Sequence, residues 1–283
     1  MIADVAEVCR GEAVFPHVES DAIYAVLEKK ENGVFATVDY PFYFDGKQPH
    51  FYTPDKEREE KVTLYRKHPL MGWIGIYLDE ICGGRFDFSD MEDFRHLKYT
   101  YQVPDTPRIC YNEVALPQQL QCRYVRYKAM EWKNTNIGEL LFWGGKTRYY
   151  PETVKGAPAE NPVNVQERMF DDDPLTYYST RLPGATLLMD FGKQVEMDRF
   201  IFIPRNDDNF IRIGDTYELY YHDGRNGWVS LGRKTASAPE LVYDNMPRGA
   251  LFHLRCLTRG EEEQVFHIKD GKQVFISNLS YIR

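Results

Sequence analysis

Short segments rich in Val, Ile, Tyr and Phe, each closed by Gly, Pro, Asn or Asp, recur along almost the whole chain. Several of them alternate apolar and polar residues, which is the period of a β-strand with one buried face, and helical periodicity is nearly absent. The clearest segments are 23–30, 33–44, 61–67, 123–130, 187–191, 199–205, 216–224 and 250–257. Many short strands joined by turn residues predict an all-β protein built from antiparallel β-sandwiches.

The order of these segments predicts an internal repeat. Residues 51–67 and 188–205 share the sequence of a strand, a turn that carries Lys and a strand with Arg at or near its end. Each copy later contains a strand with internal Arg and a last strand led by an acidic residue, at 139–143 and 263–268. We therefore predict two copies of one antiparallel sandwich in tandem.

The boundary between the copies is predicted within residues 144–162, which contain three prolines and three glycines. Such a composition is typical of a linker. We place the boundary near residue 149, so that residues 1–149 form the first domain and residues 150–283 the second. Residues 1–49 match the repeat only by position, and a separate small β unit is the alternative for them.

Composition and charge exclude several classes of protein. Hydrophobic residues make up 43% of the chain and aromatic residues 14%, as expected for a folded globular protein. The formal net charge is −8 and no run of Lys or Arg is present, so we expect no nucleic-acid partner. No apolar stretch approaches the ~20 residues of a membrane span, so we expect no membrane insertion. The five cysteines lack CxxC spacing, so neither a zinc site nor a disulfide framework is predicted.

The sequence also lacks the local motifs of catalysis. The seven histidines are scattered, and no HExxH, GxSxG or P-loop pattern is present. We therefore expect that the protein is not an enzyme. One alternative stays open, because the two carboxylates of a glycoside hydrolase can come from distant strands.

One family resemblance is carried by PVNVQERMFDDDPLTYYS (162–179), followed by residues 187–207 and by YELYYHDGRNGWVSLG (217–232). This series resembles the discoidin domains, also called coagulation-factor type-C domains, and within them the family-32 carbohydrate-binding modules. RYVRY and NIGELLFWG resemble the closing strands of the same fold. The tail resembles the C-terminal modules of exported Bacteroidetes proteins. The resemblance implies an antiparallel jelly roll with a galactose-binding-like fold, ligand loops at one end, often a structural calcium, and no catalysis.

The acidic loop at 171–176 places three carboxylates and a hydroxyl within six residues. Ca²⁺ takes six to eight oxygen ligands, and this set suits it. The resemblance implies a structural calcium in the second domain only, held by Asp171, Asp173, Thr176 and Glu263, with Glu262 as the alternative last ligand. Asp172 stands where the family pattern has Gly, so a positive φ there would strain it. The other interpretation is a solvated acidic turn bent by Pro174.

A second candidate loop, at 204–209, leaves a strongly apolar strand. Loops on rigid scaffolds are where binding residues concentrate, and this one supplies donors and acceptors that suit sugar hydroxyls. The predicted ligand contacts are Arg205, Asn206, Asp207, Asn209 and Tyr178. The alternative is a self-contained loop in which Arg205 pairs with Asp207 or Asp208 and Asn209 caps a turn.

A flat ring should accompany these polar groups, because the apolar face of a sugar stacks on an aromatic side chain. Tyr177 and Trp228 are candidates beside Tyr178, although each also fits a packing role. Trp132, in the loop MEWKNTN, fits an exposed platform at a loop tip and a hydrophobic plug over the sandwich end equally well.

Taken together, the residues and the resemblance predict a pair of non-catalytic glycan-binding modules. We expect them to belong to a longer exported chain, extracellular or in the periplasm and cell envelope, with a glycan or glycoprotein as partner. The N-terminus has no secretory signal, so a cytosolic protein is the alternative location. The alternative functions are a protein-docking or spacer unit and a hydrolase with an unrecognised carboxylate site.

Overall fold

The computed structural model describes residues 4–20, 22–70, 72–260 and 264–275. Strands contain 48% of the residues and helices 6%, which confirms the predicted all-β class. The chain divides into two compact units, one made of residues 1–69 and 211–283 and the other of residues 70–210. We call them unit 1 and unit 2. Among the described residues, no helix has the length and apolar character needed to cross a membrane.

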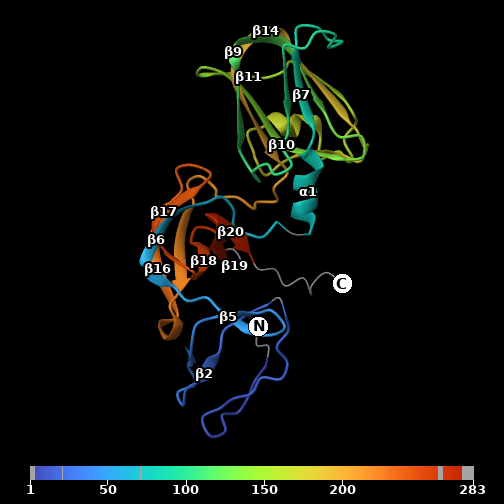
Figure 1. Ribbon diagram of the computed structural model, residues 1–283. Coiled ribbons are helices and arrows are strands. Elements are labelled where there is room, and N and C mark those ends of the chain that lie inside the picture. The colour runs from blue at the N-terminus through green and yellow to red at the C-terminus, as the bar shows by residue number, and fades with distance from the viewer. Residues whose placement is uncertain (1–3, 21, 71, 261–263, 276–283) are drawn as a thin grey trace. The chain divides into compact units, whose positions relative to one another are not determined.

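Unit 2 is built on one eight-stranded antiparallel sheet, whose strands β7, β9, β10, β11 and β14 are labelled in Figure 1. Its central path runs β11 (Thr147–Tyr149), β10 (Thr135–Gly144), β14 (Thr186–Pro204), β9 (Asn112–Lys128), β7 (Arg85–Ser89) and β8 (Tyr99–Gln102). In addition, β12 (Thr153–Gly156) pairs with β14, and β13 (Tyr178–Thr180) pairs with β10. The register between β14 and β9 shifts twice, which marks β-bulges that bend long strands.

The core of unit 2 is aromatic and belongs to this sheet. Phe86 of β7, Phe142 of β10, and Phe200 and Phe202 of β14 are all fully buried. Their period-2 placement follows from strands that turn one face inward, because side chains on a strand alternate between its two faces.

The predicted boundary near residue 149 is wrong. Strands β9 and β10 precede it, and both pair with β14, which follows it. Residues 144–162, interpreted as a linker, contain β11 and β12, which pair with β10 and β14. Their Pro and Gly residues lie in and between short strands rather than between domains.

The repeat is not supported either, and the tandem arrangement of two jelly rolls is therefore not confirmed. Residues 188–205 lie in β14 at the centre of the large sheet, whereas 51–67 contain β6 (Asp55–Leu64), whose only strand partner among the described residues is β17 (Leu241–Arg248). The two aligned segments share an alternating pattern that many strands have, but they occupy different positions in the fold.

Within its described residues, unit 1 contains four smaller antiparallel sheets. β6 and β17 form one, and a five-stranded sheet is ordered β16 (Trp228–Thr235), β15 (Thr216–His222), β18 (Leu251–Cys256), β19 (Val265–Lys269) and β20 (Lys272–Phe275). Buried side chains of both, among them Val62, Met246, Leu219 and Phe252, form one core. A 3₁₀ turn, η2 (Gly224–Asn226), joins β15 to β16.

Residues 23–51 form two sheets of their own, but they belong to the same compact unit as residues 211–283. One sheet is ordered β1 (Ile23–Tyr24), β4 (Phe42–Phe44) and β5 (Pro49–Phe51). The other pairs β2 (Leu27–Lys29) with β3 (Phe35–Thr37).

One α-helix, α1 (Trp73–Ile81), interrupts the β structure of unit 2 and was not predicted. It lies beside the sandwich near β10 and β14 (Figure 1). Leu78 packs with Ile109, Ile203 and Phe210. A helix this short gains its stability from such packing rather than from its own residues, so sequence periodicity hardly reveals it.

Candidate functional site

The outward face of α1 carries exposed aromatic and apolar side chains. Trp73 is 70% exposed and Ile76 is 48% exposed, whereas Leu78 and Ile81 point into the core. Residues three, four and seven positions apart share one helix face, so Trp73, Ile76 and Glu80 line up along α1. This is the face a ligand would meet.

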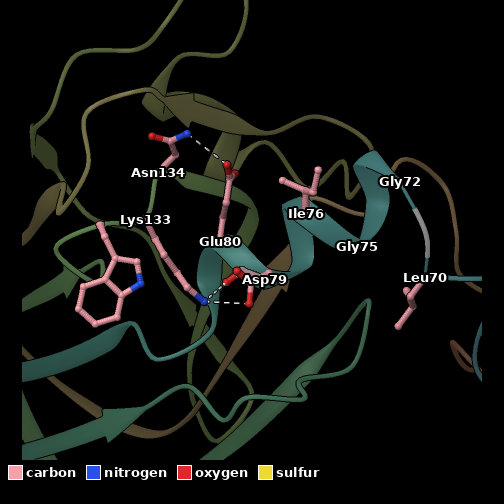
Figure 2. A pocket seen from close by; sticks show the side chains of 9 residues that line it. Leu70, Gly72, Gly75, Ile76, Asp79, Glu80, Lys133 and Asn134 are labelled. Atoms are coloured by element: carbon pink, nitrogen blue, oxygen red, sulfur yellow. Dashed lines mark hydrogen bonds and ion pairs between the residues drawn. The ribbon is translucent and has the colours of Figure 1, made fainter. Parts of the chain in front are cut away.

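Two adjoining cavities lie along this face. The first, of about 550 Å³, is lined by Leu70, Gly72, Gly75, Ile76, Asp79, Glu80, Trp132, Lys133 and Asn134 (Figure 2). The second, of about 390 Å³, is lined by Trp73, Ile76, Tyr77, Glu80, Asn134, Asn136, Glu160, Thr180, Arg181 and Arg205. They share Ile76, Glu80 and Asn134. The residues come from α1 and the segment before it, the β9–β10 loop and β10, the segment before η1 (Gln166–Phe170), and the ends of β13 and β14.

Arg205 is held in place by two rings and one carboxylate. Its guanidinium carbon lies 3.5 Å from the centre of the Tyr77 ring and 4.1 Å from that of Tyr177. Its Nε donates a hydrogen bond of 2.9 Å to Asp207 Oδ1. Cation–π contacts of this kind fix the orientation of a guanidinium at a site edge. The pairing of Arg205 with Asp207 is the one that the alternative interpretation of this loop predicts, and Arg205 lines the second cavity as well.

Glu80 stands where the two cavities meet. Its carboxylate accepts hydrogen bonds from Asn134 Nδ2, at 3.3 Å, and from Asn136 Nδ2 (Figure 2 shows the Asn134 bond). Burial raises the pKa of Glu80 above its ordinary value. Asn136 is only 5% exposed, and its Oδ1 accepts no hydrogen bond within the described part of the chain.

A second carboxylate, Glu160, lines the cavity that holds Arg205. Arg181 Nε donates to Glu160 Oε2 at 3.1 Å. Burial alone would raise the pKa of Glu160, but hydrogen bonds from Ser179 and Arg181 lower it below its ordinary value. The pKa values of Glu80 and Glu160 are thus shifted in opposite directions within one cavity.

Several predicted ligand contacts lie inside the protein instead of at the site. Tyr178 and Asn209 are fully buried, and Asn206 is 2% exposed. Tyr178 donates its hydroxyl to the Ala157 carbonyl at 2.8 Å, and Asn206 Nδ2 donates to the Pro174 carbonyl at 2.8 Å. These side chains stabilise the loops behind the site, and their burial contradicts the prediction that they contact a ligand.

The acidic loop folds around Asp171. Thr176 Oγ1 lies 2.9 Å from both carboxylate oxygens of Asp171. The Asp173 carboxylate accepts a hydrogen bond from the Leu175 backbone N–H, and its carbonyl oxygen lies 3.2 Å from Thr176 Oγ1. Asp173 therefore offers its carbonyl, rather than its carboxylate, towards Thr176. Asp172 has a φ of 63°, so the residue that replaces glycine does adopt the left-handed conformation.

The carboxylate that the structure places beside Asp171 is Glu139 of β10. It is 1% exposed, and neither carboxylate oxygen has a hydrogen-bond partner in the described chain. Burial raises the pKa of Glu139 to about 8, and nearby Asp171 adds to the shift. Arg148 is 3.9 Å away. The predicted last ligand, Glu263, lies outside the described residues, as does Glu262. Among the described residues, no group of three or more His, Cys, Asp or Glu side chains is placed to hold a metal ion.

No family model, curated protein or solved structure matches this chain. The chemistry of the site therefore rests on its own geometry. Of the other candidate rings, Trp132 is 70% exposed, and Trp228 of unit 1 is 40% exposed and packs against His222 and His253.

The most informative residues of the site were missed by the sequence prediction. Trp73, Tyr77 and Glu80 lie in the short helix, and Asn134 and Asn136 lie just before and within β10. Trp73, Ile76, Tyr77 and Glu80 have the i, i+3, i+4, i+7 spacing of one helix face. A helix of nine residues is too short for this spacing to be distinguished from the pattern of a strand. The acidic residue that begins 139–143 indicated a strand, but nothing in the sequence indicated that Glu139 lies beside Asp171.

Proposed function

We propose that unit 2 is a glycan-binding module whose ligand lies against the outward face of α1. The observation that supports this most is the clamped guanidinium of Arg205 in a cavity that also contains the exposed Trp73. Binding sites for small polar ligands combine apolar and aromatic walls with a few oriented polar groups. A sugar has an apolar face for the rings and hydroxyls for the polar groups, so it satisfies both.

The polar groups of the cavity can both donate hydrogen bonds to sugar hydroxyls and accept hydrogen bonds from them. Arg205 and Asn134 supply N–H donors, and the carboxylates of Glu80 and Glu160 supply acceptors. Because Arg205 and Glu80 are already fixed by neighbouring side chains, little conformational entropy is lost when they bind a ligand.

Glycan binding is tested by screening the intact chain on a glycan array in calcium-containing buffer. We expect specific binding that falls at least tenfold in Arg205→Ala and in Trp73→Ala, since these remove the donor and the platform. Trp228→Ala, which removes a partly exposed Trp from unit 1, is the matched control and should bind as the wild type does. Unchanged melting temperatures would show that the variants are folded.

A blank array would overturn the proposal and favour protein docking instead. Residues 5–51 offer a surface for that alternative, because they expose the large apolar side chains Val5, Val8, Val14, Leu27, Val34, Phe35, Val38 and Phe51.

We also propose a structural calcium at the acidic loop, with Glu139 in place of Glu263. The residues fit a hard cation: the buried Glu139 carboxylate lacks a hydrogen-bond partner, and Asp171, the Thr176 hydroxyl and the Asp173 carbonyl lie together. When bound, calcium would add positive charge beside two carboxylates that already face arginines, since Arg168 lies 3.1 Å from Asp171 and Arg148 lies 3.9 Å from Glu139. The chain itself holds the acidic loop 171–176 beside Glu139 of β10.

Calcium should raise the melting temperature of the wild type by several degrees relative to EDTA, because an ion that binds only the folded state stabilises it. Asp171→Asn should lose this increment. The control Glu167→Gln removes one charge from an exposed residue of the neighbouring η1 and should keep it. An equal increment in Asp171→Asn would refute the assignment.

A second candidate function, glycoside hydrolysis, is favoured by the carboxylates of Glu80 and Glu160. The pKa of Glu80 is raised and that of Glu160 is lowered, and both line one cavity. Glycoside hydrolases use such a pair, with one carboxyl group as the general acid and the other as a base or nucleophile. We favour binding, because Glu160 is engaged by Arg181 and Glu80 by two amides. Release of reducing sugar from any glycan bound on the array, lost in Glu80→Gln, would reverse this preference.

A further inference from the structure

A second exposed tryptophan, Trp132, lines the cavity that adjoins the cavity of Arg205. Trp132 is 70% exposed and lines the cavity of about 550 Å³, whereas Arg205 and Trp73 line the other. The two cavities share the side chains of Ile76, Glu80 and Asn134, so they adjoin along α1, and we call them together the groove.

The loop that carries Trp132 is fixed to α1. Lys133 Nζ donates to the Asp79 carboxylate at 2.9 Å and to the Asp79 carbonyl at 2.7 Å (Figure 2). The backbone closes a turn from Lys133 N to the Met130 carbonyl, and Gly184 N donates to the Lys133 carbonyl. Trp132 is thus an exposed ring on an anchored turn, and the interpretation of Trp132 as a buried plug does not hold.

Most charged side chains of the groove have an ion-pair partner. Lys133 pairs with Asp79, Arg181 with Glu160, and Arg205 with Asp207. Glu80 is instead bound by the uncharged amides of Asn134 and Asn136. The cavity that Trp132 lines contains the acids Asp79 and Glu80 but one base, Lys133, so this part of the groove carries excess negative charge, which disfavours an anionic sugar there.

We infer that the groove binds an uncharged oligosaccharide of at least two sugars, with one sugar on Trp73 beside Arg205, the next on Trp132, and their linkage over Glu80. This rests on the proposed glycan-binding function and deepens it: the ligand is a neutral glycan segment rather than a single terminal sugar, and rather than a sialylated, uronic or sulfated chain. Two linked sites that bind together gain affinity over either site alone, provided that the ligand spans both.

The test uses the full chain and an array of graded length, from one to six sugars, in four series: neutral hexoses, N-acetylhexosamines, uronic acids and sialylated glycans. We expect binding to a neutral series to rise at least tenfold from one sugar to two or three, with no comparable rise in the acidic series. Trp132→Ala should abolish this gain with length and leave the weak binding of single sugars. Trp132→Phe, which keeps a flat ring, should recover most of it, and Trp228→Ala is the control.

The same array distinguishes failure of this inference from failure of glycan binding itself. Equal binding of one and several sugars, wild-type binding by Trp132→Ala, or preference for an acidic series would overturn the inference and leave glycan binding standing. A blank array in all four series would overturn both.

Discussion

Phe200→Ala is expected to lower the free energy of unfolding of unit 2 by about 3–5 kcal/mol. Phe200 is fully buried in β14, with its ring centroid 5.0 Å from that of Phe86 and 5.5 Å from that of Phe88. Its strand pairs with β9 at Val114 and with β10 at Phe142. Removal of the ring leaves a cavity at the centre of the sandwich, which neighbouring rings on three strands cannot fill without moving the backbone.

Urea unfolding measures this loss as a lower midpoint at unchanged slope. Leu182→Ala is the control, because Leu182 belongs to the same unit but is 52% exposed, and it should cost less than about 0.5 kcal/mol. A loss under about 1 kcal/mol for Phe200→Ala would mean that the ring does not fill the core.

Glu139→Gln is expected to stabilise the protein at alkaline pH when divalent cations are removed with EDTA. The pKa of Glu139 is raised from 4.5 to about 8, chiefly by burial. The folded protein therefore keeps a proton that the unfolded chain releases, so stability falls as pH rises from 4.5 to about 8 and then levels off. Each pH unit in this window costs about 1.4 kcal/mol, which sums to an upper value on the order of 5 kcal/mol. The glutamine variant has no such proton and escapes this cost.

The measurement is the difference in unfolding free energy between wild type and Glu139→Gln from pH 5 to pH 9 in EDTA. The difference should grow with pH and level off above pH 8, and calcium added at pH 8 should shrink it. Exposed Glu167→Gln is the control and should follow the wild-type curve. Parallel curves for wild type and Glu139→Gln would show that Glu139 ionises freely in the folded protein.

The loop at 204–209 shows how far residue type and loop position predict a binding role. Arg205 was singled out because its loop leaves an apolar strand, and the structure does place it in a cavity wall. Its loop neighbours Asn206 and Asn209 were singled out on the same grounds, but they turn inward. Residue type and loop position indicate that a polar side chain needs a partner; they do not tell whether the partner is a backbone carbonyl or a ligand.

What the sequence by itself determined is the β class and the approximate strand segments. These depend on period-2 alternation, which is a local property. The tertiary structure alone decided which strands pair, where the units divide, and that α1 joins Trp73, Glu80, Asn134 and Arg205 in one groove. It also brought Glu139 to Asp171, from strand and loop segments that are separate in the chain. The physical reason is that any strand edge can satisfy another strand's hydrogen bonds, so the choice among partners depends on how the whole set of buried faces packs together.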